Sequence, residues 1–420
     1  MFKKNRINLP RRQFLAGGTA AGAAVAGVGL GFAQRAQAGV NAQTKLLVYI
    51  FLRGGMDGLS FVIPTEGANH TNYFNARQAT YVEPSNTLDL FNSGFGLHPN
   101  CIDLHQIRNR CAFIHAVGHP LNALTRSHFD AQEEIELGTP GSQTAQNGFL
   151  ARYLETISHD PEAIFTAMAS SSNTPVSLNG YPDVANIDSP GGFSPNTGRY
   201  ADTHLTMLRE MYNGAGELDL AGQATVDAVD LINSFDLDNY NSADGANPYP
   251  NTSIGNDLAL IAQLWGLNLG ISVATLDRGG WDTHNQQNTL PTNFGYGRNI
   301  REVSEAVRAF YSDLAARGRA NDVAIVIQSE FGRQVSENGN QGTDHGFANP
   351  MVVINGQING GMYGTFPGIA INQREGDAVV PTTDFRDVHS SVIDRIFDGG
   401  SDIGTIFPDA SYNYSPIAFT

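Results

Sequence analysis

Runs of consecutive apolar and β-branched residues recur along the chain and predict strands buried on both faces. The clearest runs lie at residues 45–52 (KLLVYIFL), 112–117, 271–276, 323–328 (VAIVIQ) and 351–354. Segments whose apolar residues follow helical spacing alternate with them, at residues 99–110, 127–137, 258–269, 301–317 and 382–397. This alternation predicts an α/β fold in which a mostly parallel central sheet is flanked by helices on both faces.

The middle of the chain has a different composition. Between residues 139 and 256 it is rich in Ser, Asn, Gly, Pro and Asp, with short helical patterns at 202–212 and 223–235. Tracts such as DNYNSADGANPYPNTS are typical of loops. We therefore expect residues 139–256 to form an insertion or cap on a single domain that spans residues 39–420.

The first 38 residues have the pattern of an export signal. Five basic residues, including the arginine pair of RRQFL, precede a weakly apolar run rich in Gly and Ala at residues 15–33, and the sequence AQA at 36–38 fits a cleavage site. This predicts a twin-arginine signal peptide, recognised by the twin-arginine export machinery, and hence a periplasmic or secreted protein. A retained membrane anchor is the alternative, although Gly and Ala dilute the apolar run below what spanning helices usually show.

The chain without this signal is strongly acidic. The sequence holds 25 Lys and Arg against 41 Asp and Glu, and six of the basic residues lie in the first 38 positions, so residues 39–420 carry a net charge of −22. Such a surface repels nucleic acid and anionic lipid. No later segment is long and apolar enough to span a membrane. We expect neither a nucleic-acid partner nor stable membrane insertion after cleavage.

The two cysteines, Cys101 and Cys111, stand at either end of a predicted helical segment. A helix of about nine residues separates its ends by roughly 13 Å, which is too far for a disulfide. Two buried thiols are therefore favoured over a bridge.

Side chains that bind metal ions follow the predicted strands. Glu330 and Arg333 come directly after the strand at 323–328, and the loop that follows carries the pair Asp344 and His345. Ligands of α/β sheets bind beyond the carboxyl ends of the strands, so this loop predicts a metal or anion site. A polar surface loop with a hydrogen-bonded histidine is the alternative.

Two further strand ends carry the same kind of residue. Asp57 lies in the glycine-rich turn after the first strand, where it is equally able to cap the next element. Asp282 and His284 follow the strand at 271–276, and alternation along an extended segment directs both side chains to one side, where they can share an ion. His389, in the last predicted helix, is expected to be packed and not a ligand.

A third site of interest opens the helical segment at 127–137. The hydroxyl of Ser127 at a helix amino end is placed to attack a phosphate or sulfate ester, with Arg126 steadying the charge and His128 binding metal or moving protons. The alternative is that Ser127 caps the helix by accepting a hydrogen bond from the backbone N–H of Asp130.

Several motifs, in this order, resemble a known family. They are RRQFL, FLRGGMDGLSFVIP, LHP, RSHFDAQEEIELG, GGWDTHNQQ, SEFGRQVSENGNQGTDHG and TTDFRDV. Together they resemble the bacterial exported proteins grouped as domain of unknown function 1501, which are similar in turn to the alkaline phosphatase and sulfatase superfamily. The resemblance covers both ends of the chain and is weak in the middle. It implies an alkaline-phosphatase-like sheet with one or two metal ions at its carboxyl edge.

The resemblance also implies roles for individual residues. Asp57 matches the first-strand metal aspartate, and Ser127 stands where the superfamily places its nucleophile. The remaining metal ligands implied are Asp282, His284 and His345. The chain departs from the superfamily at Glu330 and Phe331, which occupy the place of an Asp-His pair. The lost histidine implies either a single ion or replacement by Asp344 or His128.

Two functions remain open. The first is an exported metal-dependent hydrolase or transferase acting on a small phosphate or sulfate ester. In it Ser127 attacks, and Arg126 or Arg333 stabilises charge. A divalent ion such as zinc, manganese or calcium polarises the ester and is held by Asp57, Asp282, His284, Glu330 and His345. The second is a non-catalytic exported binding or assembly protein that keeps a degenerate phosphatase-like pocket. The retained Asp, His and Ser residues favour the first function, and Phe331 favours the second.

Overall fold

The computed structural model describes residues 45–159, 163, 165–187, 200–230, 240–289, 294–397 and 402–420, apart from short gaps at 217, 220–221, 224–225, 228 and 244–247. The predicted signal peptide at 1–38 and part of the predicted helix at 223–235 lie outside the described residues. No helix in the described part of the chain combines the length and hydropathy needed to cross a membrane.

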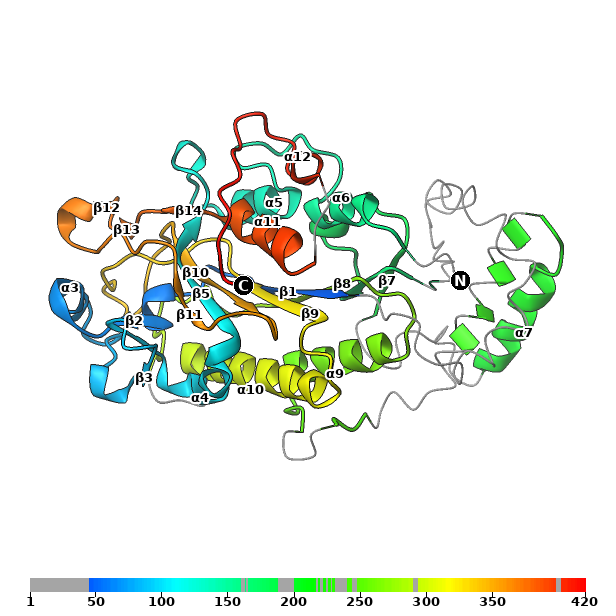
Figure 1. Cartoon of the computed structure of the whole chain (residues 1–420), viewed down its shortest axis with the longest axis horizontal. Coiled ribbons are helices and arrows are strands. Elements are labelled where there is room, and N and C mark those ends of the chain that lie inside the picture. Colours follow the sequence, from blue (N-terminus) through cyan, green and yellow to red (C-terminus); the bar gives the residue numbers. More distant parts are fainter. Residues whose placement is uncertain are drawn as a thin grey trace, which may run out of the picture.

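A nine-stranded sheet forms the centre of the molecule (Figure 1). Its order is β11 (Gly361–Tyr363), β5 (Cys111–Gly118), β10 (Asn349–Ile354), β9 (Val323–Gln328), β1 (Leu46–Leu52), β8 (Val273–Arg278), β6 (Ala167–Ser170) and β7 (Val184–Asn186), with β14 (Thr383–Asp384) also paired to β5. Among these nine strands β10 alone runs antiparallel to its neighbours β5 and β9. The sheet is therefore mixed and mostly parallel, as predicted.

Helices cover both faces of this sheet (Figure 1). One face carries α4 (Ile102–Gln106), α9 (Ser253–Gly266) and α10 (Gly295–Ala316), and the other carries α5 (His128–Leu137), α6 (Phe149–Thr156), α11 (Phe385–Arg395) and α12 (Ile403–Ile406). Strand β1 is fully buried, and its alternate residues enter two separate apolar clusters, one per face. An unbroken apolar run is what such a doubly covered strand requires, so the predicted fold class is confirmed.

The sequence pattern did not predict one helix and several very short strands. Residues 64–96, read as irregular, hold α3 (Gly67–Ala76) and most of a small antiparallel sheet of β2 (Val62–Pro64), β4 (Phe95–Leu97) and β3 (Leu88–Asp89). A second small sheet pairs β12 (Arg374–Glu375) with β13 (Ala378–Val379). The segment 99–110, predicted as one helix, is α4 between two 3-10 turns. Strands of two or three residues are too short to show a period.

The region at 139–256 contributes to the sheet. Strands β6 and β7 extend the main sheet beyond β8, and α6 packs in the core of one face. Part of the segment predicted as an insertion therefore belongs to the central layer. Helix α7 (Ala201–Met211) matches the helical pattern predicted at 202–212. Short 3-10 turns complete the chain at Gly58–Ser60, Pro84–Asn86, Leu121–Ala123, Val176–Leu178 and Ile371–Gln373.

Cys101 and Cys111 are both buried and unbridged, as predicted. Burial raises the pKa of both thiols well above the usual cysteine value. Neither thiol is therefore in the thiolate form that metal binding or nucleophilic attack requires.

Candidate metal centre

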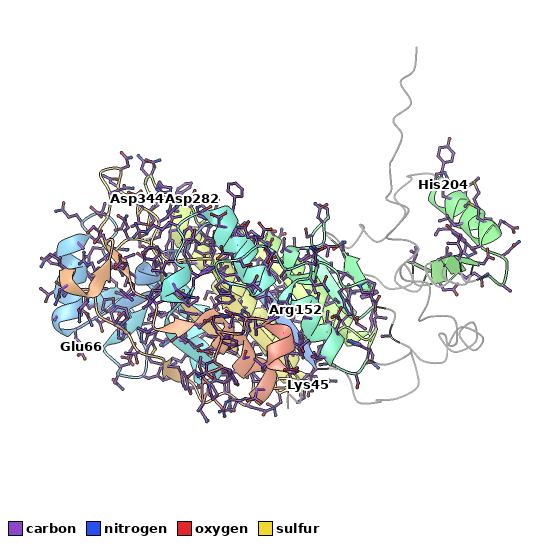
Figure 2. The ribbon with its side chains drawn as sticks, turned by 90° about the horizontal axis from the view of Figure 1, so that it is seen from above. Lys45, Glu66, Arg152, His204, Asp282 and Asp344 are labelled. Atoms are coloured by element: carbon purple, nitrogen blue, oxygen red, sulfur yellow. The ribbon has the colours of Figure 1, made fainter. Side chains whose placement is uncertain are left out.

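The topology brings three loops together at one edge of the sheet. Strands β5, β8 and β9 end at this edge, and β10, which runs the other way, begins there. The loop after β5 delivers His128, the loop after β8 delivers Asp282 and His284, and the segment before β10 delivers His345. Figure 2 places the labels of Asp282 and Asp344 next to each other, and His284 contacts both side chains.

Three imidazole rings surround one carboxylate oxygen. The Nε2 atoms of His284, His345 and His128 lie 3.0, 3.2 and 3.4 Å from Oδ1 of Asp282. His128, Asp282 and His345 offer ligand atoms that all lie within 4.8 Å of one another, the kind of group that holds a metal ion. His284 adjoins this group through the short contact with Asp282. We refer to these four residues as the histidine cluster.

The opposite ring nitrogen of each histidine faces a hydrogen-bond acceptor. Nδ1 of His128 lies 2.7 Å from Oε1 of Glu330, and Nδ1 of His284 lies 2.7 Å from Oδ1 of Asp344. Nδ1 of His345 lies 2.8 Å from the carbonyl oxygen of Arg126. A carboxylate or carbonyl only accepts, so each neutral ring carries its proton on Nδ1 and turns the Nε2 lone pair toward Asp282. Histidines that ligate metals are held in the same way.

This arrangement leaves unsatisfied acceptors facing each other. Nε2 of His284 and Nε2 of His345 are only 2.9 Å apart, and Nε2 of His128 is buried without a hydrogen-bond partner among the described residues. Two lone pairs at this separation repel unless a proton or a cation lies between them. Four ligands at zinc-like bond lengths stand about 3.4 Å apart along the edges of a tetrahedron. The spacing and chemistry of the cluster therefore fit a metal ion.

Glu330 and Asp344, both expected as ligands, hold the histidines instead. Glu330 is 1% exposed, and its oxygens also accept hydrogen bonds from the backbone N–H of Gly54 and the side chain of Gln132. Burial alone would raise the pKa of Glu330, but the hydrogen bonds from His128 and Gln132 lower it overall. Asp344 accepts from His284 and Asn338, which lower its pKa. Both carboxylates stay charged and support the cluster from behind.

The two arginines predicted to stabilise charge have other partners. Arg333 is buried, donates to the carbonyl oxygens of Gly54, Gly55, Trp281 and Thr343, and reaches Oδ1 of Asp282 at 2.7 Å. Burial would raise the pKa of Asp282, but the hydrogen bond and charge of Arg333 lower it well below its usual range. Arg333 thus fixes Asp282 in its ionised form.

Arg126 contributes to the cluster through its backbone. Its guanidinium donates to the carbonyl oxygens of Glu375 and Gly376 and lies 4.2 Å from the centre of the Phe347 ring. Only its own carbonyl oxygen contacts the cluster, at His345. The structure does not bring the guanidinium of Arg126 to the histidine cluster.

Ser127 caps α5. Its hydroxyl accepts a hydrogen bond from the backbone N–H of Asp130 at 3.4 Å, the contact expected of an N-cap. The residues on both sides of it, Arg126 and His128, touch the cluster through a carbonyl oxygen and a ring nitrogen. The chain thus carries a hydroxyl between two residues of the site.

Asp57, expected as a metal ligand, is separate from the cluster. Both of its oxygens pair with the guanidinium of Arg77, at 2.5 and 2.9 Å, and one also accepts from Ser60 and Gln287. Both partners of the ion pair are fully buried. Burial would raise the pKa of Asp57, but the charge and hydrogen bonds of Arg77 outweigh it and lower the pKa. We therefore do not retain Asp57 among the ligands.

The ring of Phe331 stands where the resemblance leads one to expect a histidine. Its centre lies 4.8 Å from that of His128 and 5.0 Å from that of His345. The turn after β1 packs closely against the same ring: a Cβ added to Gly55 would lie only 2.5 Å from it. The apolar ring therefore closes one side of the cluster and adds no ligand.

Residues that the sequence analysis overlooked extend this support. Gln132 donates to Glu330 and in turn accepts from Arg53, which pairs with Glu136 and Asp277. Gln132 stands four residues after His128, so helical spacing places both on one face of α5. This spacing is visible in the sequence and could have predicted that Gln132 lies beside His128. Arg53 gave no such signal, because its partners are distant in the sequence.

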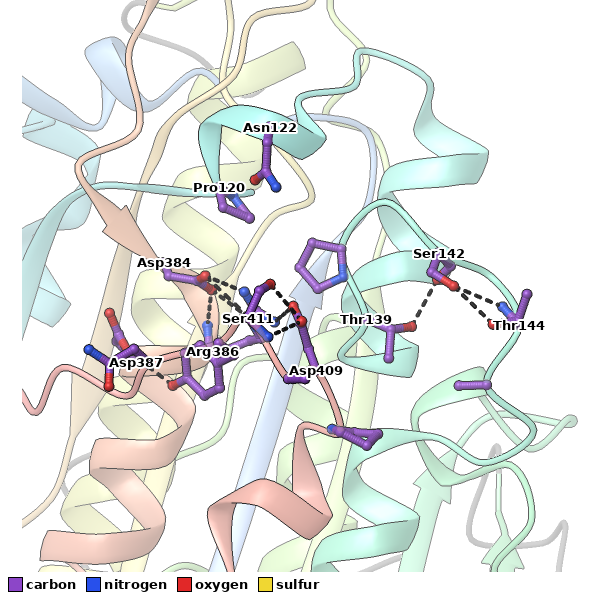
Figure 3. Close-up of a pocket in the computed structure, with 16 residues that line it drawn as sticks. Pro120, Asn122, Thr139, Ser142, Thr144, Asp384, Arg386, Asp387, Asp409 and Ser411 are labelled. Atoms are coloured by element: carbon purple, nitrogen blue, oxygen red, sulfur yellow. Dashed lines mark hydrogen bonds and ion pairs between the residues drawn. The ribbon is translucent and has the colours of Figure 1, made fainter.

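A groove that is separate from the histidine cluster lies elsewhere on the molecule (Figure 3). It encloses about 760 Å³ and is lined by the start of the loop after β5, by residues 139–145 and by residues near the carboxyl end, including Arg386 and Tyr412. No residue of the histidine cluster lines it. Arg386 is paired with Asp384 and Asp409 and stacks on Tyr412.

Comparisons with known proteins give one family and a set of distant folds. Residues 120–393, well over half of the chain, match a family described as protein of unknown function (DUF1501). No curated protein matches the sequence.

Three solved structures are similar over most of the chain. The lipoteichoic acid synthase LtaP from Listeria monocytogenes shares 9% identity over 79% of this chain and 72% of its own, with a TM-score of 0.33. A protein in the alkaline phosphatase superfamily from Vibrio parahaemolyticus shares 9% over 77% and 63%, with a TM-score of 0.31. The phosphonate monoester hydrolase of Agrobacterium radiobacter shares 10% over 88% and 79%, with a TM-score of 0.34. These values are too low to assign an activity. The family match does assign membership: the chain belongs to the family of proteins of unknown function described as DUF1501.

Proposed function

We propose that this protein is an exported metal-dependent hydrolase or transferase that acts on a phosphate or sulfate ester. The observation that carries the proposal is the histidine cluster, in which three Nε2 atoms converge on Asp282 while each Nδ1 is held by an acceptor. The converging Nε2 lone pairs and the carboxylate repel one another unless a proton or a cation lies between them.

His128, Asp282 and His345 would hold the ion, with His284 beside them. Three imidazoles and one carboxylate suit zinc, manganese or iron, whereas calcium binds oxygen ligands. This narrows the expected choice of ion and sets calcium aside. When bound, the ion would polarise the ester and stabilise the negative charge that builds up during attack.

The residues of the chain would supply orientation and the nucleophile. Arg333 holds Asp282 ionised, and Glu330, Asp344 and the carbonyl of Arg126 hold the three rings in one tautomer. In our proposal the oxygen of Ser127 forms a bond to the phosphorus or sulfur atom while the bond to the alcohol of the ester breaks; the hydroxyl proton goes to solvent, and water or a second alcohol then takes the group from the serine. The position of Ser127 at the amino end of α5 places backbone N–H groups and the helix dipole beside the developing anion. Arg126 and Arg333, which have other partners, are not assigned to the substrate.

The test combines metal content with two variants of Ser127. Ser127→Ala removes both the hydroxyl and the cap, whereas Ser127→Asn removes the hydroxyl and keeps a good N-cap. We expect stoichiometric metal in all three proteins, and a rate of hydrolysis of 4-nitrophenyl esters at least 100-fold lower in both variants than in the wild type.

Two outcomes would contradict this proposal. If Ser127→Asn retains full activity, the hydroxyl is a cap and not the nucleophile. If the wild type binds metal but hydrolyses no ester, the alternative function is favoured, a non-catalytic exported binding or assembly protein with a metal-bound pocket.

A further inference from the structure

We infer that the site selects a singly charged ester, a phosphate diester or a sulfate monoester, over a doubly charged phosphate monoester. This inference rests on the proposed function and concerns the substrate of the same site. It follows from the positive and negative groups that the structure places around the histidine cluster.

No arginine or lysine near the cluster is left to bind a second negative charge, among the residues that the structure describes. The arginines of the surrounding loops and strands all have partners: Arg53 with Asp277 and Glu136, Arg77 with Asp57, Arg278 with Glu302, Arg374 with Asp377, Arg126 with two carbonyl oxygens, and Arg333 with four carbonyl oxygens and Asp282. Lysine is rare in this chain, and Lys45 is the only one beyond residue 4.

The charges that remain at the cluster cancel once a divalent ion is bound. Asp282, Glu330 and Asp344 are three carboxylates, and each accepts hydrogen bonds that favour its charged form: Asp282 from Arg333, Glu330 from Gly54 and Gln132, and Asp344 from Asn338. Arg333 offsets one of them, and a divalent ion offsets the other two. The three rings, with Nε2 free for the ion, are neutral. The loaded site therefore has a net charge near zero.

The amino end of α5 adds a partial positive charge. A helix dipole is equivalent to roughly half an elementary charge at that end, and α5 begins at His128 inside the cluster. The partial positive charge of the helix end can stabilise one negative charge on the substrate. A second negative charge would be placed beside Glu330 and Asp344 without a counter-ion, and the charge of Glu330, which is buried, is screened less by water than an exposed charge is.

The first experiment uses one pair of unreactive anions that match in shape and differ in charge, and one pair of esters that differ in charge. At alkaline pH methanesulfonate carries one negative charge and methylphosphonate carries two, and neither reacts. We expect the metal-loaded protein to bind methanesulfonate at least tenfold more tightly than methylphosphonate, as measured by isothermal titration calorimetry. For turnover we expect a higher kcat/KM with the diester bis(4-nitrophenyl) phosphate than with the phosphate monoester 4-nitrophenyl phosphate. Tighter binding of methylphosphonate would overturn the inference.

The two readouts separate this inference from the proposed function. If neither ester is hydrolysed, the hydrolase proposal fails, and the relative affinity of the two unreactive anions still decides the charge preference. If 4-nitrophenyl phosphate is a better substrate than the diester, the hydrolase proposal stands and the charge preference is wrong.

A variant of Asp344 tests the origin of the preference. Asp344→Asn keeps an oxygen that accepts from Nδ1 of His284 but removes one negative charge, so the preference for the monoanion should fall at least fivefold. Asp103→Asn makes the same charge change on α4, where Asp103 pairs with Arg308, and should leave the ratio unchanged. An unchanged ratio in Asp344→Asn would show that charge at the cluster does not set the preference.

Discussion

His128 joins two parts of the molecule through the two nitrogen atoms of one ring. Nε2 faces Asp282 across the cluster, and Nδ1 is bound by Glu330 at the end of β9. The hydrogen bond to Glu330, partly offset by burial, raises the pKa of His128 in the metal-free protein. The ring must lose a proton to bind an ion, so Glu330 serves the site by fixing which nitrogen keeps the remaining one.

At the residue scale we predict that Glu330→Gln weakens metal binding without removing a ligand. The amide holds the ring less firmly and lacks the charge that raises its basicity, so we expect affinity to fall about 10- to 100-fold. Competition with a chromophoric chelator measures the change. Glu337→Gln is the control, because Glu337 accepts from the backbone of Ala79 and Thr80 outside the cluster. Equal affinities in wild type and Glu330→Gln would contradict the supporting role.

Helix α5 carries part of the site, and its carboxyl end shows how it is positioned. Gly138 terminates the helix with φ of +69°, and a Cβ there would lie 2.8 Å from the ring of Phe407. Gly266, at the end of α9, has open space around it. Both glycines stand at the carboxyl ends of helices, but only Gly138 has a backbone conformation and a contact that exclude a side chain.

At the element scale we predict opposite effects for the two alanine substitutions. Gly138→Ala should lower the free energy of unfolding by about 2 kcal/mol, because alanine is strained in the left-handed region and meets Phe407. Gly266→Ala should raise it by about 0.5–1 kcal/mol, because alanine restricts the unfolded chain. Urea denaturation measures both. A destabilised Gly266→Ala would show that α9 ends in a conformation that alanine does not tolerate.

The same scale shows what the sequence was able to predict. The strand at 323–328 matches β9 residue for residue, because burial on both faces leaves an unbroken apolar run. The four residues of the histidine cluster were all among the candidate ligands, since parallel strands deliver their loops to one edge, but the same reasoning also included Asp57, which lies apart from them. The pairing of Asp57 with Arg77 was not predictable: the arginine lies in a stretch without periodic pattern, and nothing local distinguishes an ion-paired aspartate from a ligand. Apart from the pairing of Arg333 with Asp282, the hydrogen-bond partners of Arg126 and Arg333 are backbone carbonyls, which any sequence offers.

For the whole molecule, buried histidines make stability depend on pH. Burial lowers the pKa of His98 and His115 to about 4 and that of His389 to about 3. The unfolded chain takes up protons near its ordinary histidine pKa, whereas the folded chain does not. Stability from these groups is thus fully present above that pKa and is lost as the pH falls toward the folded values. Asp257, whose pKa burial raises to about 6, acts in the opposite direction.

We predict that His389→Gln reduces this pH dependence. His389 donates from Nε2 to Gln328 and packs beside Tyr49 and Phe149. A group with the lowered pKa of His389 accounts for about 2 kcal/mol of lost stability between pH 7 and pH 5. Denaturant titrations at both pH values measure the difference, and the variant should lose that much less than the wild type. An identical loss in both proteins would contradict neutral burial of His389.

The distribution of the cluster along the chain has a further consequence. Its members come from positions 128, 282, 284 and 345, and from three separate connections of the sheet. An ion bound there closes two chain loops, one of more than 100 residues, that the unfolded polypeptide otherwise leaves open. The ion therefore acts as a removable cross-link, and its contribution to stability grows with the logarithm of its free concentration. If the proposed ion binds, its free concentration around the protein therefore sets how firmly this edge of the sheet is held.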